Sequence, residues 1–290
     1  MQCVWCRIHK RDDQGNVKTK TAAQQRIQSL YHYQTLDDPA RLARIFTEGT
    51  IFCSNPKDFN DPWDCRPYFS KAMLDDPVQY RRVVQWFVRI DRKRNPLIPD
   101  TEHATREQVL LNDRARLEGM MDEMTAAMEK TMSAQYRVYC LSTHADAPLM
   151  WSHYARSHQG VCLEFSVKNM LFCGALPVEY LDHYPEFDLS NDEEDASLRP
   201  LLTKSSDWRY ENEFRLVAAA PGYTFPGMLP TNDNFVNLPA GSLKSITMGC
   251  LMSEENRELV RSLARNGSRI MLKAAHRVAN RYALDIRAIA

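Results

Sequence analysis

The stretch YRVYCLSTHADAPLMWSHYARSHQGVCLEF, residues 136–165, brings two strand patterns and a short helix pattern close together. Aromatic and β-branched residues over 136–141 favour a strand. Pro148 suits the first turn of a helix, which we expect to run to Arg156. The run VCLEF after Gly160 predicts a second strand over 160–165. The segment therefore predicts a core made largely of short strands.

The same alternation of strand and helix is found on the N-terminal side. The aromatic-rich run LYHY at 30–33 predicts a strand. The two aspartates at 37–38 offer helix caps, and Pro39 fits the first helical turn. Gly49 is expected to end that helix, and 50–53 reads as a second strand.

A helical pattern interrupts the strands between residues 76 and 133. Pro77 is well placed to open it, and Pro96 and Pro99 are expected to divide it into two pieces. Leucines and methionines at 117–128 form an apolar stripe that we interpret as core packing. We therefore expect a helical insertion at about 72–134.

Strand patterns return in the C-terminal half, where one further helix is expected at 253–265. The expected strands are 213–219, 243–248, 269–274 and 281–286. Helices segregated beside many short strands indicate an α+β fold with a mixed or antiparallel core rather than a doubly wound parallel sheet. We expect a mobile tail over 1–28 and a single domain over 29–290.

The composition excludes several classes of protein. The 290 residues contain 37 Lys and Arg and 37 Asp and Glu, so the net charge is zero and a global electrostatic hold on nucleic acid is not expected, although a local basic patch is compatible with it. No apolar run is long enough to span a bilayer, and residues 1–20 lack the apolar stretch of a signal peptide. We expect a cytoplasmic protein with reduced cysteines. Cys3 and Cys6 form a lone C-x-x-C pair, which is a weak metal or redox signal.

Four separated segments combine aromatic and titratable residues, as in a cleft that binds a flat heterocycle or a sugar. The candidate site residues are Tyr31 and His32; Ser142, Trp151, His153 and Tyr154; and Trp208, Glu211, Glu213 and Arg215.

Alternation along strands decides which of these residues face the same way. Tyr31 is expected to face away from His32, so that one of the two lines the cleft while the other packs. Glu211, Glu213 and Arg215 share a face if the segment is extended. Apolar residues follow Glu213, so we expect it to lie deeper than Glu211, with an Arg215 contact lowering its pKa. The alternatives are tyrosines that only pack and a surface ion network.

The loop FNDPWD at 59–64 is expected to be ordered. Asn60, Asp61 and Asp64 can bond nearby backbone amides, and Trp63 is large enough to anchor the loop by burial. No metal site is expected, because His153 and His158 are five residues apart rather than the four that place two ligands on one helical face.

The motifs together resemble the bacterial domain of unknown function family 2971. The resemblance runs from about residue 30 to 249 and rests on FNDPWD at 59–64, LMWSHYA at 149–155, the following H-x-G-V-C-L-E-F, Lys204, and W-x-x-E-x-E-F-R at 208–215. The family name implies no activity.

The order of aromatic-His strand, strand ending in Ser142-Thr143, and late Glu-x-Glu more loosely resembles ADP-ribosyltransferase-like folds. That resemblance implies NAD as substrate, His32 orienting the ribose or nicotinamide amide, and Ser142 bracing the site. It further implies that Tyr154 or Trp151 stacks on the nicotinamide and that Glu213 holds the ribose 2′-hydroxyl. A carboxylate near an oxocarbenium-like transition state suits such chemistry.

Two other classes of function stay open. One is a non-catalytic module that binds a nucleotide or a partner in a phage-defence or toxin-type system. The other is a nuclease using Asp61, Asp64 and Glu164, whose carboxylates would have to meet around a metal ion. The sequence does not distinguish a protein acceptor from a nucleic acid acceptor.

Overall fold

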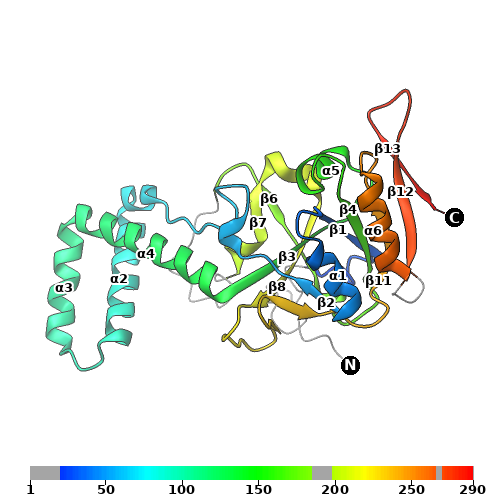
Figure 1. The fold of residues 1–290 in the computed structure, drawn as a ribbon. Helices are drawn as coiled ribbons and strands as arrows, with labels where there is room; N and C mark the ends of the chain where they lie inside the picture. The colour runs from blue at the N-terminus through cyan, green and yellow to red at the C-terminus, as the bar shows by residue number, and fades with distance from the viewer. Residues whose placement is uncertain (1–19, 185–197, 266–269, 290) are drawn as a thin grey trace.

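The computed structural model describes residues 20–184, 198–265 and 270–289 (Figure 1). The helices are α1 (Pro39–Thr47), α2 (Pro77–Arg94), α3 (Asp100–Asn112), α4 (Arg114–Gln135), α5 (Pro148–Tyr154) and α6 (Glu254–Arg265). The strands are β1 (Ser29–Gln34), β2 (Thr50–Phe52), β3 (Tyr136–Ser142), β4 (Val161–Ser166), β5 (Leu176–Pro177), β6 (Glu179–Leu181), β7 (Thr203–Ser205), β8 (Glu213–Ala219), β9 (Leu229–Pro230), β10 (Phe235–Asn237), β11 (Leu243–Met248), β12 (Met271–Arg277) and β13 (Leu284–Ala288).

A nine-stranded mixed sheet forms the body of the molecule. Its order is β13-β12-β11-β4-β1-β3-β8-β5, with β9 beside β8. The β11–β12 and β8–β9 pairs are parallel, and the other pairs in this sheet are antiparallel. The predicted α+β class with a strand-rich, mostly antiparallel core is confirmed.

Helices cover both faces of this sheet. Leu42 of α1 and Val260 of α6 pack into the largest apolar cluster, together with Leu163 of β4. On the other side Trp151 of α5 packs against Tyr33 of β1. Every residue of β8 is buried, which fits a strand enclosed on both faces.

The predicted helical segment forms an arm that projects from the sheet body (Figure 1). The 3-10 helix Lys71–Asp75 leads into α2, and the arm has its own apolar cluster that includes Val84, Phe87, Leu117 and Met121. The segment contains three long helices instead of the expected two. The additional break comes at Asp113, whose side chain accepts the Arg116 N–H and caps α4 without any proline.

Several boundaries differ from expectation: the helix expected to run to Arg156 ends at Tyr154, and the strand expected at 269–274 lies at Met271–Arg277. Ala22 is buried and its N–H donates to the Ala175 carbonyl at 2.8 Å, so the packed chain begins before residue 29. The expected tail over 1–19 lies outside the described residues, as do Cys3 and Cys6. The last strand lies at Leu284–Ala288 rather than 281–286, because Arg281 and its neighbours form the turn into it.

Candidate functional site

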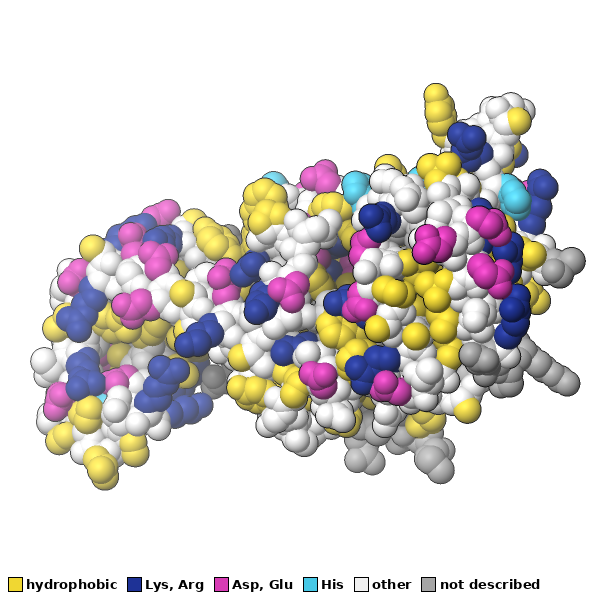
Figure 2. Space-filling view, in the orientation of Figure 1, with side chains coloured by type: hydrophobic (Ala, Val, Ile, Leu, Met, Phe, Trp, Pro, Cys, Tyr) yellow, Lys and Arg dark blue, Asp and Glu magenta, His cyan; other side chains and the backbone are white. Residues whose placement is uncertain are grey.

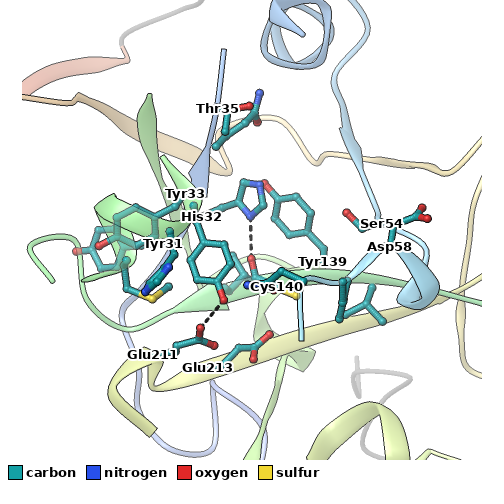
Figure 3. A pocket seen from close by; sticks show the side chains of 18 of the residues that line it. Tyr31, His32, Tyr33, Thr35, Ser54, Asp58, Tyr139, Cys140, Glu211 and Glu213 are labelled. Carbon is teal, nitrogen blue, oxygen red and sulfur yellow. Dashed lines mark hydrogen bonds between the residues drawn. The ribbon is translucent and has the colours of Figure 1, made fainter. Parts of the chain in front are cut away.

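A cavity of about 540 Å³ opens between β1, β3 and the segment 54–64, a volume typical of small-molecule sites (Figure 3). It forms because β1 and β3 diverge. The two strands are paired at Tyr31 and Ser142, and β1 continues beside β4 while Val138 of β3 bridges to Ser54 instead. The cavity therefore occupies a gap within the sheet.

His32 bridges this gap at its base. Its Nδ1 donates to the Cys140 carbonyl at 2.8 Å, and its ring stacks on Tyr139 at 4.1 Å. Burial lowers the pKa of His32 to about 4, so the imidazole is neutral at physiological pH. Because a carbonyl only accepts hydrogen bonds, Nδ1 carries the proton and Nε2 is left as an acceptor.

Tyr31 and His32 both line the cavity, which corrects the expectation that only one of them would. Alternation holds in part: Tyr31 packs with Tyr33 and Trp151, whereas His32 lies against Tyr139. Both still reach the cavity because it lies in the gap beside the strand rather than over one face of the sheet.

At one wall of the cavity lies a buried group of three carboxylates and two cations, which we call the acid-rich cluster; all its members except Arg215 line the cavity. Its members are Asp64, Lys204, Glu211, Glu213 and Arg215. With every group ionised, three negative and two positive charges leave a net charge of −1.

Arg215 organises the cluster. Its guanidinium donates to both oxygens of Asp64, at 2.9 and 2.7 Å, and to both oxygens of Glu213, at 2.8 and 3.0 Å. A further N–H donates to the Leu201 carbonyl. The loop at 59–64 is thereby joined to β8, and Arg215, which is fully buried, is occupied by protein groups.

Glu211 has a different environment from Glu213. Its Oε2 accepts from Lys204 Nζ at 2.5 Å, and its Oε1 accepts from the Tyr154 hydroxyl at 2.5 Å (Figure 3). Burial and the neighbouring Glu213 raise the pKa of Glu211. For Glu213, burial acts in the same direction, but Arg215 and Lys204 outweigh it and hold its pKa below the ordinary value. Glu211 is therefore the member that takes up a proton more readily.

The expected lowering of the Glu213 pKa by Arg215 is confirmed, but the expected depth is not. Glu211 and Glu213 are 2% and 4% exposed, so neither is deeper. Glu211 belongs to the 3-10 helix Ser206–Glu211 and not to an extended strand, and Asn212 at φ 46° reverses the chain before β8 begins.

Two buried polar atoms at the cavity have no hydrogen-bond partner within the described part of the chain. They are the Tyr139 hydroxyl and Gln34 Nε2. An unpaired buried polar group costs about 1–3 kcal/mol. Their position indicates that a polar ligand would complete the hydrogen bonding of this cavity.

The other predicted site residues divide into two groups. His153 and Tyr154 line the cavity, whereas Trp208 does not. The Trp208 ring lies beside His153, with 5.8 Å between the two ring centroids, and Lys204 Nζ lies 4.9 Å from the centroid of the Trp208 ring. Ser142 is fully buried and donates to the Glu211 carbonyl at 2.6 Å, so it braces the turn that carries Glu211.

Two predicted ligand contacts are corrected. Trp151 is fully buried, its indole N–H donates to the Ala145 carbonyl, and its ring meets Tyr33 edge-on, so it cannot stack on a ligand. Arg215 likewise cannot reach a ligand, because it is enclosed and fully paired with Asp64 and Glu213. Both residues face the interior because α5 and β8 are covered by neighbouring elements.

The FNDPWD loop is held by charge rather than by its tryptophan. Trp63 is 66% exposed, which contradicts its expected burial, whereas Asp61 and Asp64 are buried. Asp61 Oδ1 accepts the Trp63 N–H at 2.9 Å, and Asp64 pairs with Arg215. Asn60 lines the cavity.

Sequence reasoning missed Gln34, Tyr139 and Lys204 as site residues. Lys204 belongs to the family resemblance but is not among the candidate site residues, because its contact with Glu211 depends on the 3-10 turn between them. Tyr139 reads as one more aromatic of a strand. The sequence feature that could have indicated Tyr139 is its position beside Cys140 on β3, the strand that neighbours β1 and His32.

The carboxylates needed by a nuclease do not come together. Glu164 lies on β4 and pairs with Lys244 and Lys273, whereas Asp64 belongs to the acid-rich cluster. Among the residues described, no group of three or more His, Cys, Asp or Glu has the placement of a metal site. None of the helices in the described ranges combines the length and apolarity needed to cross a bilayer.

Comparison with known proteins gives a match to a family model. No curated protein and no solved structure matches the chain. Residues 150–216 match the family model described as "Protein of unknown function (DUF2971)", a span that runs from α5 to β8, includes His153, Tyr154, Glu211, Glu213 and Arg215, and leaves the FNDPWD loop outside it. The resemblance expected from the motifs is therefore confirmed over 150–216, and in this segment the chain is similar to the DUF2971 family.

Proposed function

We propose that the cavity binds NAD and that the protein is an ADP-ribosyltransferase-like enzyme. The observation that carries the proposal is that a neutral His32, the Tyr154 ring and the Glu211 carboxyl all line one cavity of about 540 Å³. Aromatic walls, hydroxyl groups and carboxylates suit a nicotinamide ring and the ribose attached to it.

Each group has a role that its environment supports. His32 Nε2 would accept a hydrogen bond from the carboxamide or a ribose hydroxyl, and the unpaired Tyr139 hydroxyl would supply a second contact. Tyr154 would pack against the nicotinamide. Glu211 takes the place that the resemblance gave to Glu213, because Arg215 holds Glu213 in its ionised form, whereas the pKa of Glu211 is raised and its partner Tyr154 lines the cavity.

In the proposed step the bond between ribose C1′ and the nicotinamide nitrogen breaks, and nicotinamide leaves as a neutral base with the electron pair. An oxygen or nitrogen of the acceptor forms the new bond to C1′, and its proton passes to Glu211. A carboxylate whose pKa is raised accepts a proton more readily than an ordinary glutamate does. Its negative charge also stabilises the positive charge that develops on the ribose.

The test is release of nicotinamide from labelled NAD, with protein and nucleic acid acceptors from a lysate analysed separately. Glu211→Gln keeps the shape and should reduce the rate on the order of a hundredfold. Glu255→Gln on exposed α6 is the matched control and should leave the rate unchanged. Turnover by Glu211→Gln equal to wild type would remove Glu211 from the mechanism.

The second candidate is binding of a nucleotide without turnover. The hydrogen bonding of the Glu-x-Glu pair favours it, because both oxygens of Glu213 and both oxygens of Glu211 are already engaged by protein groups. Calorimetric titration with NAD and with ADP-ribose separates the candidates. Binding of either compound without nicotinamide release would support the module, and loss of that binding in Tyr139→Phe would place the ligand in this cavity.

A further inference from the structure

The helical arm carries a concentration of positive charge on one face of α2. Within 81–94 the helix has five arginines and one lysine against a single acid, Asp91. At 100° per residue, four exposed cations among these fall within about 120° of the helix circumference. These four, which we call the basic face, are Arg81, Arg82, Arg92 and Lys93.

The basic face points away from the interior of the arm. The buried residues of α2 are Val83, Val84, Phe87 and Val88, which lie on the opposite side of the helix. All four members of the basic face are exposed, whereas Arg89 on the same side of α2 is half-buried and already has an interaction partner, so it is not counted among them. Figure 2 shows Lys and Arg side chains gathered at the lower end of the arm, where α2 runs in Figure 1.

Little of this charge is neutralised within the described part of the chain. Asp91 is engaged by Arg106 and His103 of α3. Arg92 meets the largely exposed Asp100 at 3.5 Å, and a pair so exposed is weak. The Arg81, Arg82 and Lys93 side chains make no ion pair with any residue that the structure describes. The surplus is therefore local, in a chain whose net charge is zero.

The chemistry of the basic face favours phosphate over the other anionic partners. Three of its four cations are arginines, whose guanidinium fork matches two phosphate oxygens. Arg81 and Lys93 are twelve residues apart, so the charges extend over about 18 Å of helix. A membrane would require the apolar side of α2 to insert, but that side packs within the arm.

We propose that the basic face of α2 binds the phosphate backbone of nucleic acid, without a requirement for base sequence. The proposal is independent of the reaction assigned to the cavity. Such binding depends on counterion release, so it weakens steeply as salt rises.

The test is fluorescence anisotropy with a labelled DNA duplex of about 20 base pairs and a labelled single-stranded RNA of about 20 nucleotides. Binding is measured between about 50 and 200 mM salt. The test variant is R81Q/R82Q/K93Q. The control variant, K57Q/R277Q/R281Q, removes the same charge from exposed positions of the sheet body. Exposed substitutions leave the fold intact, which the thermal melts of both variants check.

The wild type and the control are expected to bind alike, and the test variant should lose tenfold or more in affinity at low salt. Its slope of log affinity against log salt should fall by about 2–3, because each lost phosphate contact to a duplex contributes about 0.9. Three results would overturn the proposal: no binding by the wild type at low salt, equal losses in both variants, or tighter binding to phosphatidylserine vesicles than to either nucleic acid.

Discussion

Two buried carboxylate clusters of one sheet are built with opposite charge balance. The acid-rich cluster has three carboxylates for two cations. Glu164, on β4, has two lysines for one carboxylate: Lys244 lies 3.0 Å and Lys273 2.8 Å away, and hydroxyls of Ser29 and Ser245 donate as well. Burial acts to raise the pKa of Glu164, but these donors lower it to about 2.

The difference separates a carboxylate that is held ionised from one whose pKa is raised. Glu164 has donors in excess, so it stays ionised and has no reason to exchange a proton. Glu211 competes with Glu213 for Lys204, and its pKa is raised. A shortage of cations beside a cavity is therefore the feature that marks Glu211 as a candidate for chemistry.

The largest expected effect comes from removing the central cation of the acid-rich cluster. Arg215→Met leaves Asp64 and Glu213 without their guanidinium and should lower the free energy of unfolding by about 3–5 kcal/mol. Urea denaturation measures it. Lys273→Met beside Glu164 is the control and should cost less than about 1 kcal/mol, since Lys273 is partly exposed and Lys244 stays. Equal losses would show that charge balance does not distinguish the clusters.

The two glutamates should respond oppositely to neutralisation. Glu164→Gln removes hydrogen bonds to charged donors and should cost about 1–3 kcal/mol at neutral pH. Its lowered pKa means that this stabilisation is present above pH 4.5 and is lost as the pH falls toward 2. Glu211→Gln should cost little or stabilise, because ionisation of Glu211 is disfavoured by the fold. Denaturation curves measure the free energy of unfolding of both variants. A larger loss of stability in Glu211→Gln than in Glu164→Gln would contradict the assigned difference between the two glutamates.

The pKa of His32 is shifted mainly by burial, whereas the pKa values of Glu164 and Glu213 are shifted mainly by neighbouring charges and donors. His32 therefore allows the effect of burial to be tested separately. Its folded pKa of about 4 lies below the ordinary 6.5, so the unfolded chain binds the proton more tightly. Stability should therefore fall as the pH drops from 6.5 toward 4, by roughly 1–2 kcal/mol between pH 6.5 and 5. The readout is the difference between wild type and His32→Gln, which lacks this group. Parallel pH profiles would contradict a neutral buried imidazole.

The smallest expected effect concerns the loop at 59–64. It tests whether the Trp63 side chain or the charge of Asp64 holds this loop against the sheet body. Trp63 is exposed, so Trp63→Ala should change the free energy of unfolding by less than about 0.5 kcal/mol. Asp64→Asn should cost several times more, because it weakens the pair with Arg215. A loss of several kcal/mol on truncating Trp63 would mean that the loop packs more tightly than its exposure indicates.

Local rules predicted the elements well and the cavity poorly. The cap at Asp38, the helix start at Pro77 and the Met121 stripe all follow from nearby sequence, and each appears in the structure. The divergence of β1 from β3 does not, because it depends on which distant segment pairs with each strand edge. Ser54 takes the edge of β3 at Val138, and no pattern around Ser54 signals it.

The candidate site was predicted in composition but not in arrangement. Aromatic and acidic residues in separate segments correctly indicated a shared cavity at His32, Tyr154 and Glu211. Which carboxylate keeps a free role could not be predicted, since it depends on Arg215 closing on Glu213 and Asp64. Exposure of Trp63 also escaped prediction, because loop sequence does not specify whether a covering element exists.

The position of β1 has a consequence for how the chain is made. This strand lies between β3 and β4, and Tyr33 pairs with Cys162, so its partners are translated more than a hundred residues later. At roughly 5–20 residues per second, the aromatic edge of β1 waits on the order of ten seconds outside the ribosome without a partner. The arm helices contact one another locally and can pack during that time. A chaperone that shields residues 29–34 during synthesis should therefore raise the yield of folded protein more than one that acts after release.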